Sequence, residues 1–292
     1  MDVPEREESR AGAREGARQN AHARYEWEIL LPAHRYVFAV DNGKLLEFNR
    51  PGDLSFHRFH RYQALKPDMP VHGMIAWPNT VLLRGPVVAL VDPGLRMQGP
   101  PLLLALQAAG LGPDDLDLII NTHAHDDHVQ GNAYFPGVPV AVHELEFGSA
   151  GPGRGLGSGA DFRPEGGEVQ LLRGEAGELA SGLSFIRTPG HTAGSICVLA
   201  GTADGLLLLG GDTVGPLPSY FLENRLPEGF PGADQLLASW QRIRMLSPAV
   251  IVPGHNPPLR LGRRSAAPDG SPRDVLAGPD ASAGGPHPPA PG

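Results

Sequence analysis

The chain has 292 residues, of which 41% are hydrophobic, and it carries a net charge of −8 and a single cysteine, Cys197. This charge, without a basic stripe, argues against general nucleic-acid binding, although a local basic groove stays open. No apolar run approaches the about 18 residues of a membrane span, and no apolar export signal follows the first charges. Since nothing in the cysteine content requires an oxidising compartment, we expect a cytoplasmic protein without membrane attachment.

Composition divides the chain into three parts. Residues 1–24 alternate Arg and Glu with Gly and Ala, and residues 262–292 are rich in Pro, Gly, Ala and Ser. Such segments cannot bury enough apolar surface to fold, so we expect both tails to be disordered. Residues 25–261 are long enough to bury a full core and are expected to form one domain.

Within that domain, strands are expected first at 71–76, 80–84 and 87–91. A helix should follow from Pro101 to Ala109, because a proline opens this run and a glycine follows it. Seven further strand-like runs lie near 116–120, 139–143, 169–172, 183–188, 195–200, 205–209 and 249–252. A second helix is predicted by apolar residues at three- and four-residue spacing, namely Leu236, Leu237, Trp240, Ile243 and Leu246.

Many strands and few helices favour an α/β fold of two mixed sheets packed face to face, with the helices outside. The Gly-rich segment 148–167 is too poor in apolar residues to belong to the core. We interpret it as a solvated loop, in preference to a flap that closes over a site.

Three histidines and two aspartates are concentrated in the six residues from His123 to His128, His-Ala-His-Asp-Asp-His. Neutral imidazole and carboxylate are the nitrogen and oxygen ligands of divalent zinc, and spacings of one or two residues let one turn of chain present several of them together. The cluster therefore predicts a metal site.

Metal-capable residues also follow three later apolar runs. His191 follows 183–188 through Pro-Gly, Asp212 follows 206–209 through Gly-Gly, and His255 follows 250–252 through Pro-Gly. The first cluster likewise follows the run 116–120. Strand ends are where rigid scaffolds carry their sites, so we expect these segments to meet at one metal centre.

The motifs T-H-A-H-D-D-H-V-Q-G-N, T-P-G-H-T, G-G-D-T and V-P-G-H occur in the order found in the metallo-β-lactamase superfamily, which the chain resembles over roughly 75–260. The resemblance implies a four-layer αββα sandwich. It also implies two metal ions, with zinc as the first expectation and iron or manganese as alternatives. By this resemblance His123, His125 and His191 would bind one ion, Asp127, His128 and His255 the other, and Asp212 would bridge both.

Two aspartates need separate treatment. Asp126 competes with Asp127 as a ligand, but the family pattern places the ligand immediately before the last histidine, so we expect Asp127 to be both a ligand and the catalytic residue that orients a hydroxide or moves its proton. Asp92 matches a family position that supports the site from behind, and it is equally well interpreted as a turn residue that ends a strand.

Other residues of the same types are not expected at the centre. His72 and His143 lie near strand-like runs that could approach the site mouth, but we do not include them among the site residues. Cys197 lies within an apolar run, and the cysteine ligand of some superfamily members would stand at the position of Asp212. We therefore expect Cys197 to pack in the core.

Several substrate classes of the superfamily are disfavoured because the sequence lacks a feature that each of them requires. A glyoxalase-II-like enzyme would need a helical domain after His255, and the β-CASP insertion of RNA-processing nucleases would need a longer segment between Asp212 and His255. The lactonases with a tyrosine three residues after the bridging aspartate would require Tyr at 215, where Gly215 stands. We expect a hydrolase of a small-molecule ester, thioester or lactone.

Two alternatives stay open. A phosphodiesterase or nuclease of the same fold would use the same metal pair. A persulfide dioxygenase-like oxidoreductase would use a single iron, at the site of His123, His125 and His191. The sequence indicates neither the substrate itself nor the oligomeric state.

Overall fold

The computed structural model describes residues 24–41, 44–47, 71–146, 166–214 and 218–261. The predicted tails lie outside these residues, except for Arg24, as do Gly215 and nearly all of the Gly-rich segment 148–167. Tail disorder and the limits of the domain therefore stay predictions.

The first of two six-stranded sheets has the strand order β1-β5-β6-β7-β8-β9. It is mixed, because β6 to β9 pair in parallel whereas β1, β5 and β6 pair antiparallel. Its strands are β1 (Glu26–Leu31), β5 (Thr80–Arg84), β6 (Val88–Val91), β7 (Leu118–Ile120), β8 (Val140–His143) and β9 (Val169–Leu172).

The second sheet follows the chain order β10-β11-β12-β13-β14-β15. Only β13 and β14 pair in parallel there, joined by a crossover that contains helices. Its strands are β10 (Ala176–Ala180), β11 (Leu183–Arg187), β12 (Ile196–Thr202), β13 (Gly205–Gly211), β14 (Val250–Pro253) and β15 (Leu259–Arg260).

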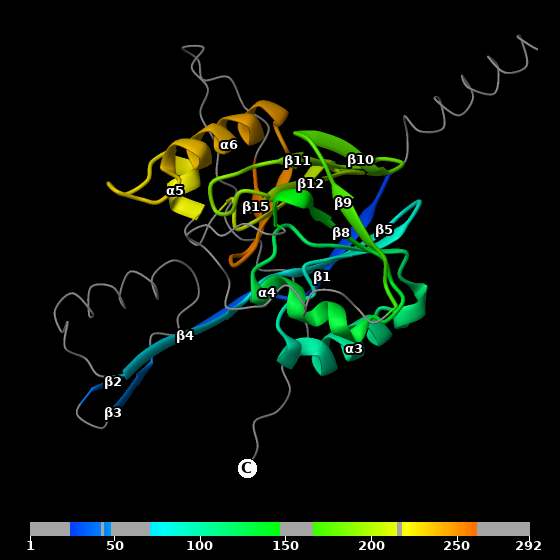
Figure 1. Cartoon of the computed structure of the whole chain (residues 1–292), viewed down its shortest axis with the longest axis horizontal. Coiled ribbons are helices and arrows are strands. Elements are labelled where there is room, and N and C mark those ends of the chain that lie inside the picture. The colour runs from blue at the N-terminus through cyan, green and yellow to red at the C-terminus, as the bar shows by residue number, and fades with distance from the viewer. Residues whose placement is uncertain (1–23, 42–43, 48–70, 147–165, 215–217, 262–292) are drawn as a thin grey trace, which may run out of the picture.

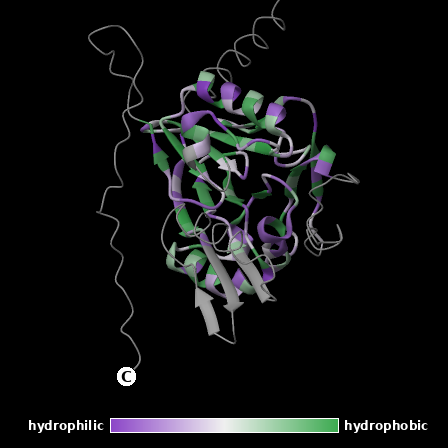
Figure 2. Cartoon of the chain, turned by 90° about the vertical axis from the view of Figure 1, so that its left-hand side faces the viewer, coloured by the Kyte–Doolittle hydropathy of each residue, from purple (hydrophilic) through white to green (hydrophobic). Residues whose placement is uncertain are grey.

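The central strands bury both of their faces, so neighbouring residues enter different parts of the core. Leu83 packs between the two sheets, whereas Leu82 packs on the outer face of the first sheet with residues of α3 (Gly99–Ala108). The outer face of the second sheet is covered by α5 (Pro218–Glu223) and α6 (Ala233–Leu246), whose Trp240 is buried. This is the expected αββα sandwich, with α6 and α3 on opposite sides in Figure 1 and the apolar strands inside in Figure 2.

Short helical elements join the layers. They are α4 (Asp126–Val129) and the 3-10 turns η1 (Arg96–Gln98), η2 (Pro113–Asp115), η3 (Gln130–Tyr134) and η4 (Glu144–Glu146). A third sheet of order β3-β2-β4 consists of β2 (His34–Asp41), β3 (Lys44–Glu47) and β4 (Val71–Trp77), and it extends away from the sandwich (Figure 1). Among the described residues, no helix has the length and apolar character needed to cross a membrane.

Several strands were not expected from the sequence, namely β1, β2, β3, β10 and β15. β10 reads Ala-Gly-Glu-Leu-Ala, which has little intrinsic strand preference. It forms because it pairs antiparallel with β11. The expected helices are both present, and α3 begins two residues before Pro101.

Candidate metal centre

All seven predicted ligands follow the carboxyl ends of strands. His123 and His125 follow β7, His191 follows β11, and Asp212 follows β13 directly. His255 comes two residues after β14. Asp127 and His128 lie on α4, a single helical turn where the sequence suggested a turn of loop, and the N–H of His128 closes that turn by donating to the carbonyl of His125 at 2.9 Å.

The structure brings these residues together in three overlapping groups. Within each group, one side-chain nitrogen or oxygen of every member lies within 4.8 Å of the others, a spacing that could hold a metal ion. The groups are His123, His125 and His191; His123, His128 and Asp212; and Asp127, His128 and His255. Their overlap indicates one continuous centre.

The first group consists of three imidazole rings. Nδ1 of His125 lies 3.0 Å from Nε2 of His123 and 2.9 Å from Nε2 of His191. Burial, and then the neighbouring His128, hold the pKa of His123 well below its usual range. Burial likewise lowers the pKa of His191. Both rings therefore favour the neutral form, which is the form that binds metal.

The third group, Asp127, His128 and His255, combines a carboxylate with two imidazoles. Oδ2 of Asp127 lies 3.1 Å from Nε2 of His255 and 3.7 Å from Nε2 of His128. Burial opposes ionisation of Asp127, but the charges of His128 and His255 keep its pKa below the usual value. Burial also opposes protonation of His255, but the carboxylates of Asp212 and Asp127 raise its pKa to about 9.

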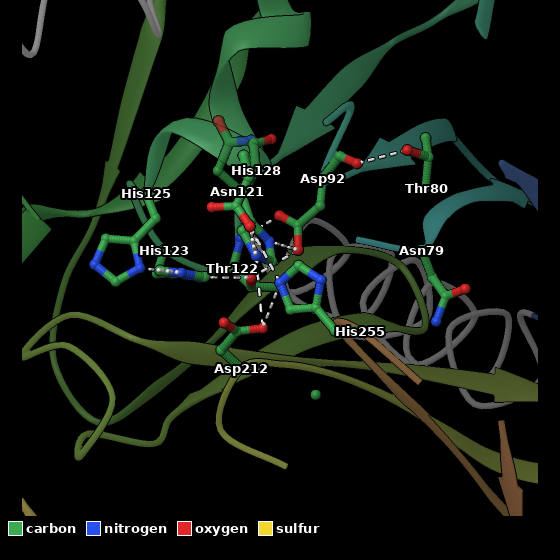
Figure 3. A network of polar contacts seen from close by, with 12 residues as sticks. Asn79, Thr80, Asp92, Asn121, Thr122, His123, His125, His128, Asp212 and His255 are labelled. Carbon is green, nitrogen blue, oxygen red and sulfur yellow. Dashed lines mark hydrogen bonds and ion pairs between the residues drawn. The ribbon is translucent and has the colours of Figure 1, made fainter. Parts of the chain in front are cut away.

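Asp212 lies between the first and the third of these groups. Its Oδ2 is 3.4 Å from Nε2 of His191, and its Oδ1 is 3.5 Å from Nε2 of His128 and 3.4 Å from Nε2 of His255. Although burial opposes ionisation, the nearby histidines, His255 first, hold the pKa of Asp212 well below its usual range. Figure 3 shows this carboxylate facing His255 and His128.

Two buried atoms of this centre fit a divalent cation. Within the described part of the chain, Nε2 of His128 and Oδ1 of Asp212 are buried without a hydrogen-bond partner. A buried polar atom left unpaired costs about 1–3 kcal/mol, so a fold that aims two of them at each other needs something to satisfy them. A lone pair on nitrogen and a carboxylate oxygen are both metal donors, and a divalent ion would serve both.

Asp92 supports the centre from behind. Its Oδ2 lies 2.9 Å from Nδ1 of His128, while its two oxygens accept the N–H and the hydroxyl of Thr122 at 2.8 and 2.7 Å (Figure 3). The supporting contact is confirmed, and the interpretation as a turn residue holds too, since Asp92 has φ +50°. Burial opposes protonation of His128, but this carboxylate, with those of Asp127 and Asp212, raises the pKa of the ring well above its usual value.

A residue that sequence reasoning missed holds the loop of His255. The side-chain amide of Asn79 donates to the carbonyls of Pro253 and Asn256, each at 2.8 Å, and its oxygen accepts the N–H of Ala33 at 2.8 Å. Asn79 is buried, so its two bonds to the loop of His255 are shielded from water. Only its type, a polar residue directly before a buried strand, could have drawn attention to it.

The sequence matches the metallo-beta-lactamase superfamily over residues 78–255. This chain belongs to the metallo-β-lactamase superfamily. Its fold is that superfamily's sandwich of two mixed sheets.

Relatives of this superfamily member differ in what they are named for. This chain is 34% identical over 193 residues to the human metallo-beta-lactamase domain-containing protein 1. The match covers 64% of each chain, so this chain spans under two thirds of that relative's length. It is 31% identical over 143 residues to an N-acyl homoserine lactonase of Bacillus cereus, covering 46% of this chain and 51% of the lactonase.

One solved superfamily structure is an N-acyl homoserine lactone hydrolase with the product N-hexanoyl-L-homoserine bound at the catalytic metal centre. The TM-score is 0.55 with 18% identity, and the match covers 80% of this chain and 92% of that one. At this identity the likeness shows the fold alone.

Residues that the sequence analysis set apart are placed as follows. His143 is buried, its Nε2 contacts the carbonyl of Gly174 at 3.0 Å and its Nδ1 accepts the N–H of Leu145 at 3.3 Å. It is not part of the three groups that could hold a metal ion, in agreement with its exclusion from the expected site residues. The side chain of His72 lies outside the described residues. Cys197 packs in the core as expected, and burial raises the pKa of its thiol to about 12.

Proposed function

We propose that this superfamily member is a dinuclear metal-dependent hydrolase, with zinc as its ion, that cleaves an ester, thioester or lactone of a small molecule. The observation that carries the proposal is the position of Asp212, with one carboxylate oxygen facing His191 and the other facing His128 and His255. A single carboxylate between two sets of histidines is an arrangement that suits two cations.

The proposed ligand sets are those implied by the sequence motifs. His123, His125 and His191 would hold one ion, Asp127, His128 and His255 the other, and Asp212 would contact both. When bound, such ions supply an activated water nucleophile and positive charge for a leaving group.

Asp127 is the proposed catalytic residue among these. Its side chain is 27% exposed, whereas those of His128 and His255 are 0% and 5% exposed. A carboxylate whose pKa is lowered is ionised at neutral pH, so it can accept a proton from the nucleophile and pass it to solvent. Its contact with Nε2 of His255 orients it for this role.

The substrate class rests on the relatives and on charge. The lactonase relative acts on a small molecule by its name, and the net charge of −8 does not favour nucleic acid. The tyrosine of lactonases has no counterpart at Gly215, so we do not extend the proposal to N-acyl homoserine lactones in particular. The sole cysteine is a buried free thiol, which supports a cytoplasmic location.

Hydrolysis of a lactone, a thioester and a chromogenic phosphodiester tests this function, measured on chelator-treated protein before and after zinc or manganese is added. Metal-dependent turnover of the lactone or thioester, lost in His123→Ala, is expected. Turnover of the phosphodiester alone would replace the substrate class with nucleotides or nucleic acids. Silence on all three, with oxygen uptake by iron-loaded protein, would favour the oxidoreductase alternative.

A further inference from the structure

Glu146 is a carboxylate outside the seven predicted ligands that joins two of the histidine loops. It is the last residue of η4, the turn that follows β8, and it is partly buried. Its Oε2 accepts the N–H of Ala124 at 2.8 Å. Its Oε1 accepts the hydroxyl of Thr192 at 2.6 Å and the N–H of Gly194 at 2.7 Å.

These three donors flank the histidines of the first group. Ala124 lies between His123 and His125, and Thr192 follows His191 directly. The two loops are joined at their bases by a backbone hydrogen bond from Ile196 to Thr122 at 2.9 Å. Glu146 joins them a second time, beside the histidines themselves, and two ties at different points restrict how the loops can move relative to each other.

The hydroxyl protons near Glu146 can be assigned from the network. The backbone N–H of Thr192 donates to Oγ of Ser195 at 3.1 Å, and the two hydroxyl oxygens lie 2.6 Å apart. Since the Thr192 hydroxyl must donate to the carboxylate, the Ser195 hydroxyl must donate to Thr192. The hydrogen bonds therefore run from the N–H of Thr192 to the Ser195 hydroxyl, then to the Thr192 hydroxyl and finally to Glu146. The carboxylate is the final acceptor of this series.

The turn that carries Glu146 is itself held in place by His143. Nε2 of this buried ring lies 3.0 Å from the carbonyl of Gly174 and must donate, so Nδ1 is free to accept the N–H of Leu145. The neighbouring backbone of η4 is thereby tied to the turn before β10. Glu146 projects from a supported turn, as a side chain that positions others must.

We propose that Glu146 is a positioning residue that sets the distance between the His123–His125 segment and His191, and thereby the metal affinity of the first group. This inference rests on the proposed function, because it assumes that the first group binds an ion. Outer residues that orient metal ligands typically change metal affinity 10–100-fold when they are replaced. Glu146 acts through loop backbone and a hydroxyl, whereas Asp92 contacts the ring of His128.

The chemistry of the contacts requires a carboxylate at this position. Glutamine has one acceptor oxygen, and its NH₂ group would face either the N–H of Ala124 or the donors of Thr192 and Gly194. Glu146→Gln should therefore release one loop, and Glu146→Ala both. The close approach of Glu146 also requires glycine at position 194. A Cβ there would lie 2.6 Å from Oε1 of Glu146 and 2.9 Å from its backbone nitrogen.

Cobalt(II) titration of the chelator-treated full chain, followed by absorption and by metal content, tests this role. We expect Glu146→Ala to weaken one of the two metal equivalents 10–100-fold and to leave the other unchanged, with a smaller loss in Glu146→Gln. Glu144→Ala is the matched control, since Glu144 lies in the same turn but pairs with the exposed Arg173 at 3.2 Å. Both equivalents binding Glu146→Ala as tightly as wild type would overturn the proposal.

Two further measurements keep the outcome clear. If Glu146→Ala does not fold, Thr192→Val removes the donated hydroxyl and Thr192→Ser restores it, so only the valine variant should lose affinity. Hydrogen exchange of the metal-free Glu146→Ala protein should rise in peptides 122–128 and 190–196 but not in 250–256. Unchanged exchange would overturn the proposal that Glu146 holds the two loops together. Wild type that binds no divalent ion would instead overturn the proposed function.

Discussion

Oδ2 of Asp92 and Nδ1 of His128 lie 2.9 Å apart, on the opposite side of the imidazole from the nitrogen that faces Asp212. Both side chains are buried. Because the carboxylate accepts a hydrogen bond from the N–H at Nδ1, the neutral ring keeps its hydrogen there and leaves the lone pair of Nε2 for a cation. The contact thus determines which nitrogen of His128 is presented to the centre.

Asp92→Asn should weaken metal binding about 10–100-fold with the fold retained, because asparagine tolerates the positive φ of this position but cannot accept both Thr122 and His128 as the carboxylate does. Asp92→Ala should also lower the free energy of unfolding, by about 1–3 kcal/mol for each buried donor left unpaired. Metal titration and urea unfolding measure the two effects. Wild-type affinity in Asp92→Asn would contradict the role assigned to Asp92.

Asp127→Ala should reduce turnover at least about 100-fold while the circular dichroism spectrum stays that of wild type, because it removes both a proposed ligand and the proposed proton acceptor. Asp126→Ala, one residue earlier on α4, should change turnover by little. Steady-state kinetics on the best substrate compare the pair. Equal losses in the two variants would show that the ligand was assigned to the wrong aspartate.

Gly190→Ala should destabilise the protein and weaken binding at His191. Gly190 has φ +137°, and a Cβ there would lie 2.6 Å from the backbone N and Cα of Leu236 in α6, which cannot move like a flexible side chain. Gly229→Ala is the control, because Gly229 also has positive φ (+74°) but meets nothing within 4 Å. Thermal unfolding should show a clearly larger drop for Gly190→Ala, and similar drops would mean that backbone strain, rather than the contact with α6, is responsible.

Cys197 should make stability depend on pH above neutrality. Burial raises the pKa of its thiol from the ordinary 9.0 to about 12, so the unfolded chain ionises first as the pH rises. The stability contributed by the neutral thiol is fully present below pH 9 and is lost as the pH rises from 9 to 12. This loss is about 1.4 kcal/mol at pH 10. Urea unfolding at pH 7.5 and 10 should therefore show a larger loss in wild type than in Cys197→Ala, and an equal loss would refute the assignment.

Metal removal should lower the melting temperature as well as abolish activity. An ion that binds only the folded state stabilises it by about 2.7 kcal/mol at 100 times its dissociation constant. Calorimetry with chelator and with zinc measures the shift, which should shrink in His255→Ala because one proposed ligand is missing. A melting temperature that does not respond to zinc or manganese would argue against a metal centre in the folded protein.

The sequence alone determined the strands that carry the ligands and the residue types at their ends. A strand buried on both faces is a continuous apolar run, as in β7, β13 and β14, and a ligand just beyond it is visible in the same short window. The predicted sandwich is confirmed for this reason. The assignment of individual ligands stays a prediction, although the structure brings all seven together.

Only the tertiary structure decided which residues hold those ligands in place. Glu146 bonds Ala124 and Gly194, and Asn79 bonds Pro253 and Asn256, across separations in the chain that leave no local pattern. β10 likewise forms through its pairing with β11 and not through its own composition. Periodicity records which side chains are buried near one another in sequence, whereas a hydrogen bond between distant segments exists only after the two sheets have packed.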